Sequence, residues 1–207
     1  MKLTPTSTAA LIATAALGLS VLTTPPAEAQ DQNEACSFPN DTYEFNQDEI
    51  DRLYDCLKDN LAKGYGKAGH EIGANFRSWN LTQNGIGPAF AGHGDRFLLT
   101  YANDIAFNDY VKYRDEGGFS MPVGSVLAKE SWKVNKEGKP QRGPLLIMTK
   151  LKAGEADEFG NWLYSGVSPG SGKEFKVSQK FCHDCHGVFE DQDALGYPAE
   201  DVRLKAE

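Results

Sequence analysis

The sequence predicts a mainly β (α+β) fold, in which an antiparallel sheet carries a few flanking helices. Two observations support this class. Short apolar runs recur through the second half of the chain, some of them alternating with polar residues, and turn-forming residues separate them. Glycine and proline are common, with 21 and 10 residues, and aromatic residues make up 11% of the chain. Long helical bundles rarely have that composition, whereas sheets joined by turns usually do.

The first 29 residues have the pattern of a secretory signal peptide. Lys2 supplies a positive charge, residues 9–22 form an uncharged and mostly apolar run, and the small residues of "AEA" predict cleavage after Ala29. A membrane anchor is the alternative, but the run is shorter than the ~20 residues needed to span a bilayer. The segment therefore predicts export, and we expect the mature protein in the periplasm.

The mature chain is expected to be one acidic unit. Removing 29 of the 207 residues leaves 178, which is enough for a substantial core. The removed segment carries one lysine and one glutamate, so the net charge stays at -8. An acidic surface repels phosphates, which argues against nucleic acid and anionic membranes as partners.

A helix is predicted near the start of the mature chain, in "NQDEIDRLYDCLKDNLAKGYG" (46–66), where apolar residues recur at helical spacing. Asn46 is suited to the N-cap, and Glu49 occupies the capping-box position. We therefore divide the mature chain into an N-terminal segment with this helix (30–68) and a main domain (69–207).

The four cysteines are Cys36, Cys56, Cys182 and Cys185. An exported protein meets an oxidising compartment, where disulfides persist. If the C-terminal pair has another use, Cys36 and Cys56 are predicted to form a disulfide. That bridge would close a loop of about 20 residues and stabilise the fold by about 3 kcal/mol. Two free thiols are the alternative.

The other elements follow from alternation and from turn residues. We expect strands over 96–103, 121–134, 143–151 and 160–167, and helices over 104–115 and 177–190. A turn at 136–140 predicts a hairpin. Within 121–134 one face is expected to hold Val126, Ala128, Glu130, Trp132 and Val134, and the other Leu127, Lys129 and Ser131.

The motif that carries chemistry is "FCHDCHG" (181–187), close to the C-terminus. Cys-x-x-Cys-His is the attachment sequence of c-type haem. On one helical turn, the thiols of Cys182 and Cys185 each form a thioether with a haem vinyl group, and His186 then ligates the iron from one side. The single motif predicts one covalently bound haem c, with its iron.

Two other interpretations of this motif are weaker. A thioredoxin-like Cys-x-x-Cys requires a βαβ context, which the pattern does not show. A zinc site requires two more ligands at short spacing, and only His70, His93 and His183 remain. His183 lies inside the motif, where we expect it to be solvated.

The sixth ligand position of the iron separates electron carriers from proteins that bind small molecules. Electron carriers usually fill it with methionine or histidine. Met121 and Met148 fall in or beside predicted strands, where we expect them to pack. His70 and His93 are possible ligands, but a lone histidine in a loop is more often exposed, and we expect both to be exposed. The expectation is therefore an open distal face, which suits the binding or oxidation of a small molecule.

Six stretches, taken in order, resemble the cytochrome P-460 family, which includes the related β-sheet cytochromes c′. They are "GHEIGANFRSW" (69–79), "GDRFLLTYAND" (94–104), "MPVGSVLAKESW" (121–132), "GPLLIMTKL" (143–151), "GNWLYS" (160–165) and "FCHDCH" (181–186). The resemblance implies an antiparallel, mainly β fold, usually in a homodimer.

The resemblance also implies a role for one lysine. P-460-type members bond a lysine side chain covalently to the edge of the haem, and the matching residue in "LAKES" is Lys129. The alternative is a solvated lysine on an alternating strand. Members that oxidise hydroxylamine also place a proton-accepting group in the distal pocket, because the substrate loses protons as it loses electrons.

No residue can be given that proton-accepting role from the sequence. Glu130 follows the lysine directly, but strand alternation points it to the opposite face. Arg96 could pair with a haem propionate or with a ligand, or it could be a surface charge. Phe97, Tyr101 and Trp132 could line the haem pocket or belong to the core.

These observations predict a periplasmic mono-haem c protein with an open distal site. The expected activity is oxidation of hydroxylamine or a related small nitrogen species, with electrons passing to a soluble acceptor cytochrome. A non-catalytic protein that binds nitric oxide or a similar gas is one alternative. An electron-transfer cytochrome c with a sixth ligand is the other.

Overall fold

The computed structural model describes residues 36–89 and 92–204. The predicted signal peptide, 1–29, lies outside these residues. Within the described part of the chain, no helix has the length and apolar character needed to cross a bilayer.

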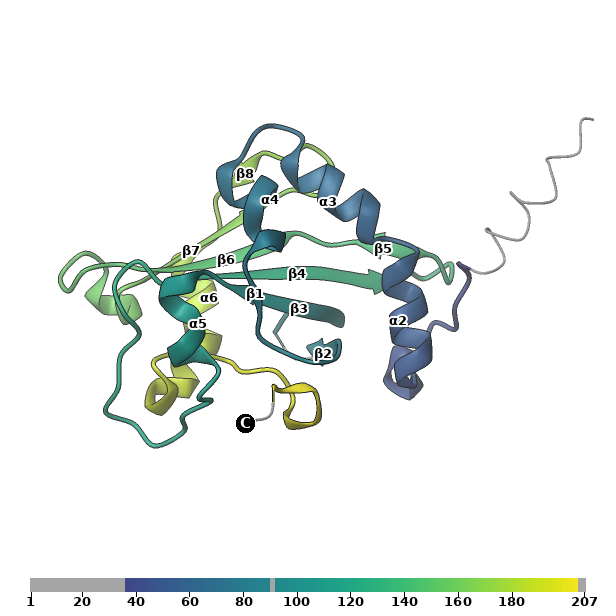
Figure 1. Cartoon of the computed structure of the whole chain (residues 1–207). Helices are drawn as coiled ribbons and strands as arrows, with labels where there is room; N and C mark the ends of the chain where they lie inside the picture. The colour runs from purple at the N-terminus through teal and green to yellow at the C-terminus, as the bar shows by residue number, and fades with distance from the viewer. Residues whose placement is uncertain (1–35, 90–91, 205–207) are drawn as a thin grey trace, which may run out of the picture.

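One antiparallel sheet organises the molecule (Figure 1). Its path runs β1-β3-β4-β6-β7-β8, with β2 paired to β3 and β5 paired to β4. Over the described residues its eight strands are β1 (Asn80–Leu81), β2 (Gly87–Ala89), β3 (Arg96–Ala102), β4 (Val126–Val134), β5 (Pro140–Arg142), β6 (Leu145–Lys150), β7 (Trp162–Val167) and β8 (Glu174–Phe175). The predicted mainly β class is confirmed.

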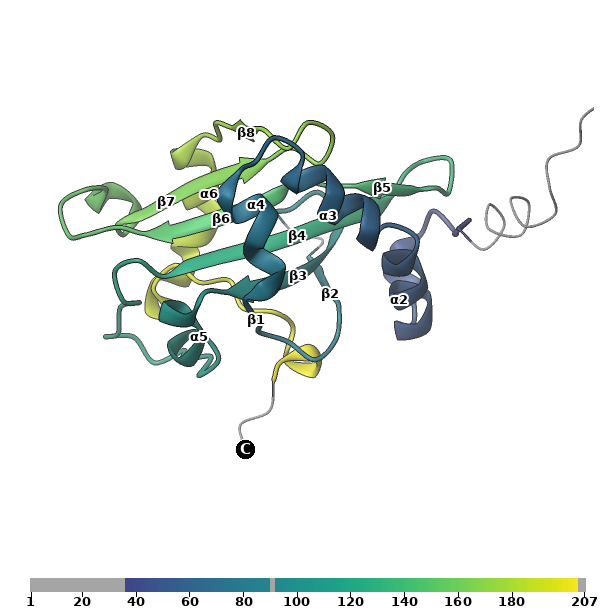
Figure 2. The ribbon, with the colours of Figure 1, turned by 45° about the horizontal axis from the view of Figure 1, so that its top comes forward.

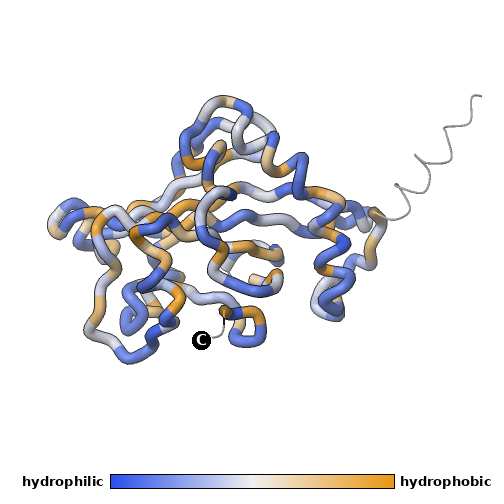
Figure 3. The backbone as a smooth tube through the Cα atoms, in the orientation of Figure 1, coloured by the Kyte–Doolittle hydropathy of each residue, from blue (hydrophilic) through white to orange (hydrophobic). Residues whose placement is uncertain are grey.

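Short helices flank the sheet. They are α2 (Gln47–Asp55), α3 (Lys58–Gly66), α4 (Glu71–Asn75), α5 (Asp104–Tyr110) and α6 (Gln179–His186), with 3-10 turns η1 (Thr42–Glu44), η2 (Phe76–Ser78), η3 (Asp157–Phe159), η4 (Gly187–Gln192) and η5 (Glu200–Val202). Helices α3 and α4 lie over one face of the sheet, and α6 with the C-terminal segment lies on the other (Figures 1 and 2). Figure 3 shows apolar residues recurring along the strands between these layers.

The helix predicted over 46–66 is two helices. Its start is as expected, because the Asn46 side chain accepts from the Glu49 N–H while the Glu49 carboxylate accepts from the Asn46 N–H, both at 3.0 Å. The helix ends at Asp55, and α3 begins in a new direction after Leu57 (Figure 1). Both halves can then bury apolar side chains against the sheet, among them the fully buried Leu61.

The predicted disulfide between Cys36 and Cys56 is present and joins the N-terminal segment to the end of α2. Phe38 follows this bridge and is buried in the core. Its N–H donates to the carbonyl of Gly138, in the turn between β4 and β5, at 2.9 Å. The N-terminal segment is therefore held to both the helix and the sheet.

Helix α5 begins where the sequence predicts and ends early. The side chain of Asn103 caps it by accepting from the Ala106 N–H at 3.0 Å. We expected the helix to continue to residue 115, but it ends at Tyr110, whose side chain is fully buried. The following residues form turns before the glycine pair at 117–118.

Central strand β4 has the predicted alternation but a later start. Gly124 has a positive φ of 86°, which interrupts the extended backbone, so the strand covers Val126–Val134 rather than 121–134. Ala128 and Trp132 pack in the core cluster on the α2 and α3 side, whereas Leu127 packs in a separate cluster on the other side. The second side of the sheet is therefore the one on which Lys129 lies.

Candidate haem site

Helix α6 presents the Cys-x-x-Cys-His motif. It covers Gln179–His186 rather than the predicted 177–190, and its N-cap is Ser178, whose hydroxyl accepts from the Phe181 N–H at 3.2 Å. Cys182 and Cys185 are both free thiols, and their spacing of three places them on the same side of the helix. Partial burial raises the pKa of Cys182.

The imidazole of His186 is buried and is held by a backbone carbonyl. Its Nδ1 lies 2.9 Å from the oxygen of Ala194. Because a carbonyl can only accept, Nδ1 must carry the hydrogen and Nε2 keeps its lone pair. Burial, followed by the charge of Lys129, lowers the pKa of His186 to about 3. His186 is therefore neutral, in the form that binds a metal.

A cavity of about 390 Å³ lies against this helix. Its volume is within the range typical of ligand pockets. It brings together all four sequence-predicted site residues, Lys129, Cys182, Cys185 and His186. The other residues that line it are Gly92, His93, Gly94, Arg96, Pro144, Leu146, Ile147, Met148, Tyr164, Ser165, Val177, Phe181, Phe189 and Gly196.

Lys129 extends from β4 into this cavity and is only 4% exposed, so it is not a solvated lysine. Its Nζ donates to the carbonyl of Gly196 at 3.2 Å. Burial lowers its pKa to about 8. Lys129 and Gly196 also line a second cavity of about 270 Å³, so the two cavities adjoin at this side chain.

The two histidines that we expected to be exposed are both partly buried, and they lie in different places. His93 lines both cavities, and its ring centre lies 6.0 Å from that of His186. Burial, together with the charges of Lys129 and Arg96, lowers the pKa of His93 to about 4. His70 does not line the cavity. It caps α4, where its Nδ1 accepts from the Gly73 N–H at 3.1 Å.

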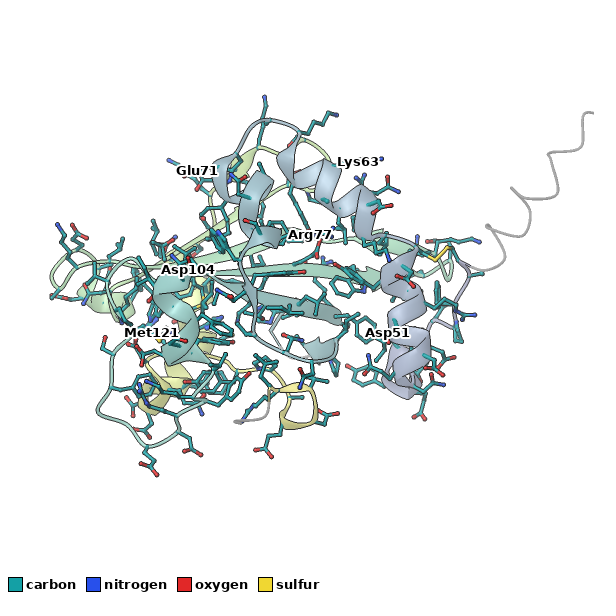
Figure 4. The ribbon with its side chains drawn as sticks, viewed as in Figure 1. Asp51, Lys63, Glu71, Arg77, Asp104 and Met121 are labelled. Carbon is teal, nitrogen blue, oxygen red and sulfur yellow. A yellow bond between two sulfur atoms is a disulfide. The ribbon has the colours of Figure 1, made fainter. Side chains whose placement is uncertain are left out.

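The methionines pack as predicted. Met121 is 2% exposed and Met148 is 4% exposed, and both belong to the apolar cluster beneath β4. Figure 4 shows Met121 beside α5. Met148 also contributes to the wall of the large cavity.

Arg96 lies at the edge of the cavity and is half-buried. Its Nη1 is buried and has no hydrogen-bond partner within the described residues. Burial lowers the pKa of this guanidinium. A buried donor without an acceptor is costly, so this atom suits an anionic group that enters the cavity, such as a haem propionate.

Glu130 points away from the cavity, as strand alternation predicts. It is fully buried on the opposite face of β4, where it forms an ion pair with Arg77 and accepts from the hydroxyl of Tyr54 at 2.9 Å. Figure 4 shows Arg77 between the helices and the sheet. Glu130 is therefore not a distal base.

Of the two alternatives left open for Phe97, Tyr101 and Trp132, the structure supports the core and not the haem pocket. All three side chains belong to the core on the same side of the sheet as Glu130, because they occupy the strand positions that alternate with the cavity-facing ones. The aromatic residues of the cavity are Tyr164, Phe181 and Phe189.

Sequence reasoning missed Tyr164. Its ring centre lies 5.4 Å from that of His186, and its hydroxyl lies 3.2 Å from Nδ1 of His183. His183, which we expected to be solvated, is therefore partly buried against Tyr164 and Phe159. Alternation along β7 predicts that Tyr164 shares a face with Trp162, but it does not predict that Tyr164 contacts the Cys-x-x-Cys-His motif. Phe189 lies at a kink inside η4, and Gly196 lies outside any helix or strand, so no periodic pattern marks either residue.

The two rival interpretations of the motif find no support. Over residues 36–89 and 92–204, no group of three or more histidine, cysteine, aspartate or glutamate residues is arranged to hold a metal ion. The strand that precedes α6 belongs to an antiparallel sheet, which is not the parallel βαβ context of a thioredoxin-like site.

Comparison with protein families matches residues 73–195 to the model described as cytochrome P460. The chain belongs to the cytochrome P460 family. Members of the cytochrome P460 family bind haem, and the match includes Lys129 and the complete Cys182–His186 motif. A search of curated proteins gives no match.

The residues that line the candidate site fit a haem. The cavity contains two free thiols on one helical turn, a buried imidazole with an available Nε2, and a buried guanidinium nitrogen that lacks an acceptor. Most of the remaining wall is apolar, as a porphyrin ring requires.

Proposed function

We propose that this member of the cytochrome P460 family is a periplasmic mono-haem c protein that oxidises hydroxylamine or a related small nitrogen species. The observation that carries the proposal is the convergence of Lys129, His93 and His186 on one cavity beside the free Cys182 and Cys185. The motif supplies the means of attachment, and the two additional bases distinguish the cavity from a simple attachment site.

Each of these residues has a defined part in holding the cofactor. Cys182 and Cys185 would form the two thioethers, His186 would ligate the iron through Nε2, and Arg96 would pair with a propionate. The bound haem supplies an iron that binds a small nitrogen compound and accepts its electrons. The apolar wall formed by Leu146, Met148 and Tyr164 would exclude bulk water.

The chain must also accept protons during this oxidation. Conversion of hydroxylamine (NH₂OH) to nitroxyl (HNO) releases two electrons and two protons. The electrons would leave one at a time to a soluble acceptor cytochrome. His93 is suited to take up a proton at a ring nitrogen, because it lines the cavity while no aspartate or glutamate among the described residues does so.

Lys129 is the residue proposed to bond to the haem edge. Its buried position is consistent with this role, because its Nζ lies inside the cavity and donates only to the Gly196 carbonyl among the described residues. A covalent bond from this side chain would link the ring to β4, in addition to the two thioethers on α6.

The surface around α6 is suited to electron exchange. Cys185 is exposed, and the neighbouring Phe181 and Val188 are 68% and 72% exposed. An acceptor cytochrome that docks here would approach the thioether edge of the haem.

We also propose a homodimer, on the basis of the family resemblance.

The experiment that tests the proposal is an absorption spectrum of the purified holoprotein, reduced and then exposed to carbon monoxide, followed by an assay of hydroxylamine-dependent reduction of an acceptor cytochrome. We expect a strongly red-shifted ferrous band that responds to carbon monoxide, together with turnover. An ordinary high-spin haem c spectrum that responds to carbon monoxide, without turnover, would instead indicate a gas-binding protein.

An electron-transfer cytochrome is the second candidate, and the position of His93 favours it. Because His93 and His186 line the same cavity, His93 would be placed to supply a second imidazole ligand to the iron of a bound haem. The observed separation between the ring centres of His93 and His186 is 6.0 Å. A low-spin spectrum that carbon monoxide does not change, and that becomes high-spin in His93→Ala but not in His70→Ala, would establish this candidate.

A further inference from the structure

A short backbone segment, residues 193–196, contacts two functional side chains at once, and we call it the strap. The carbonyl of Ala194 accepts from Nδ1 of His186 at 2.9 Å, and the carbonyl of Gly196 accepts from Nζ of Lys129 at 3.2 Å. One segment therefore sets the positions of both the iron ligand and the lysine.

The backbone of the strap is strained. Asp193 and Ala194 have positive φ values of 52° and 60°, in the left-handed region that residues with a side chain rarely adopt. Such a conformation is unfavourable because it brings Cβ too close to the following carbonyl oxygen. Two such residues in succession persist only where surrounding contacts hold them in place.

Asp193 supplies several of those contacts, through its side chain and its carbonyl. Its carboxylate oxygens lie 2.6 and 2.8 Å from Nζ of Lys150, and one of them also accepts from the Met121 N–H at 2.7 Å. The carbonyl of Asp193 accepts from Nε1 of Trp162 at 2.8 Å. Because Lys150 ends β6 and Trp162 begins β7, the strap is attached to two adjacent strands of the sheet.

The ion pair lies in a largely buried position. The side chains of Lys150 and Asp193 are 6% and 12% exposed, and Lys150 also donates to the carbonyl of Gly160 at 2.9 Å. Removing one partner would leave the other charge without compensation. The strap would then lose one of the contacts that oppose its backbone strain.

We propose that Asp193 is a positioning residue, whose ion pair with Lys150 holds the strap so that the Ala194 and Gly196 carbonyls orient His186 and Lys129 toward the haem. The inference rests on the proposed function, because it takes His186 as the iron ligand. A carbonyl held on Nδ1–H increases the basicity of the ligating Nε2 and so favours the ferric state. Releasing the strap weakens this effect.

The test compares the Asp193→Asn and Asp193→Ala holoproteins with the wild-type holoprotein. We expect the midpoint potential to rise in both variants, with the larger change for alanine. An outer-shell contact of this kind typically changes metal affinity by 10-fold or more, and a 10-fold change in the ferric-to-ferrous preference is about 59 mV. The iron–histidine stretching frequency in the resonance Raman spectrum should fall.

The matched control is Glu130→Gln, which breaks a buried ion pair on the opposite face of the sheet without contacting the strap. This variant should lose stability but keep the midpoint potential and the stretching frequency. The inference is overturned if Asp193→Asn leaves both quantities unchanged, or if Glu130→Gln moves them equally. If Asp193→Ala does not fold, the midpoint potential and the stretching frequency of Asp193→Asn test the role of Asp193.

Failure of the proposed function would give other results than failure of the strap inference. If the wild-type protein carries no covalently bound haem, or if His186→Ala leaves the iron ligation intact, the site assignment itself is contradicted. A protein with haem ligated by His186, whose potential does not depend on Asp193, would contradict only the role of the strap.

Discussion

Replacing Cys36 and Cys56 together by alanine is expected to lower the free energy of unfolding by about 3 kcal/mol. The two cysteines are 20 residues apart in the sequence, and a bridge that closes a loop of this length removes chain entropy mainly from the unfolded state. In the folded state, Phe38 stays buried in the core and its N–H still reaches Gly138, so the native contacts should survive the change.

Thermal and urea denaturation of the holoprotein provide the measurement. For a protein of this size, a loss of about 3 kcal/mol corresponds to a fall in Tm of roughly 6–12 °C. Reduction of the unchanged protein should give the same fall, whereas the double variant should not respond to reductant. The double variant should have the same haem absorption spectrum as the wild-type protein, because neither cysteine lines the candidate haem cavity.

A fall in the free energy of unfolding of less than about 0.5 kcal/mol would refute this reasoning. It would mean that the disulfide does not restrict the unfolded chain further, for example because residual structure already brings the two cysteines together. A change in the haem spectrum would contradict the separation of the disulfide from the site.

The remaining predictions concern single side chains. Glu130→Ala should lower the free energy of unfolding by about 3–5 kcal/mol, because it leaves the charge of Arg77 partly buried and without its partner; urea denaturation measures this, and a loss below about 1 kcal/mol would contradict it. Lys129→Met should remove the red shift of the ferrous band while the two thioethers keep the haem attached, as mass spectrometry of the intact protein would show; a red shift that remains would exclude the lysine bond. His93→Ala should slow hydroxylamine-dependent reduction of the acceptor by about 100-fold or more, the usual contribution of a general base, whereas His70→Ala should not change the rate. Equal rates in the two variants would exclude His93 as the proton acceptor.

Local features of the chain were predictable from the sequence. The Asn46–Glu49 capping box and the Asn103 cap depend on residues three positions apart, so their geometry follows from neighbouring side chains alone. The alternation along β4 correctly assigned Lys129 and Glu130 to opposite faces, because the side-chain period of a strand is 2. The haem motif is also local, since all three of its residues lie on one helical turn.

Alternation could not decide which face of the sheet carries the site. The sequence left Phe97, Tyr101 and Trp132 open to the haem pocket or to the core, and the structure turns them toward helices α2 and α3. That outcome depends on which helices cover each face, and this is settled by packing between segments far apart in the chain. The same reason explains why His70 and His93, similar in sequence context, differ in position.

The sequence by itself determined the class of fold, the disulfide pair, the haem motif and the family. Each of these follows from spacing along the chain or from residue types within a short window. Only the tertiary structure placed His93 and Tyr164 beside His186. It also showed the ion pair between Asp193 and Lys150 that supports the strap. These contacts join residues up to 93 positions apart, between His93 and His186, across irregular backbone without periodicity. They form only when the sheet and the C-terminal segment pack together.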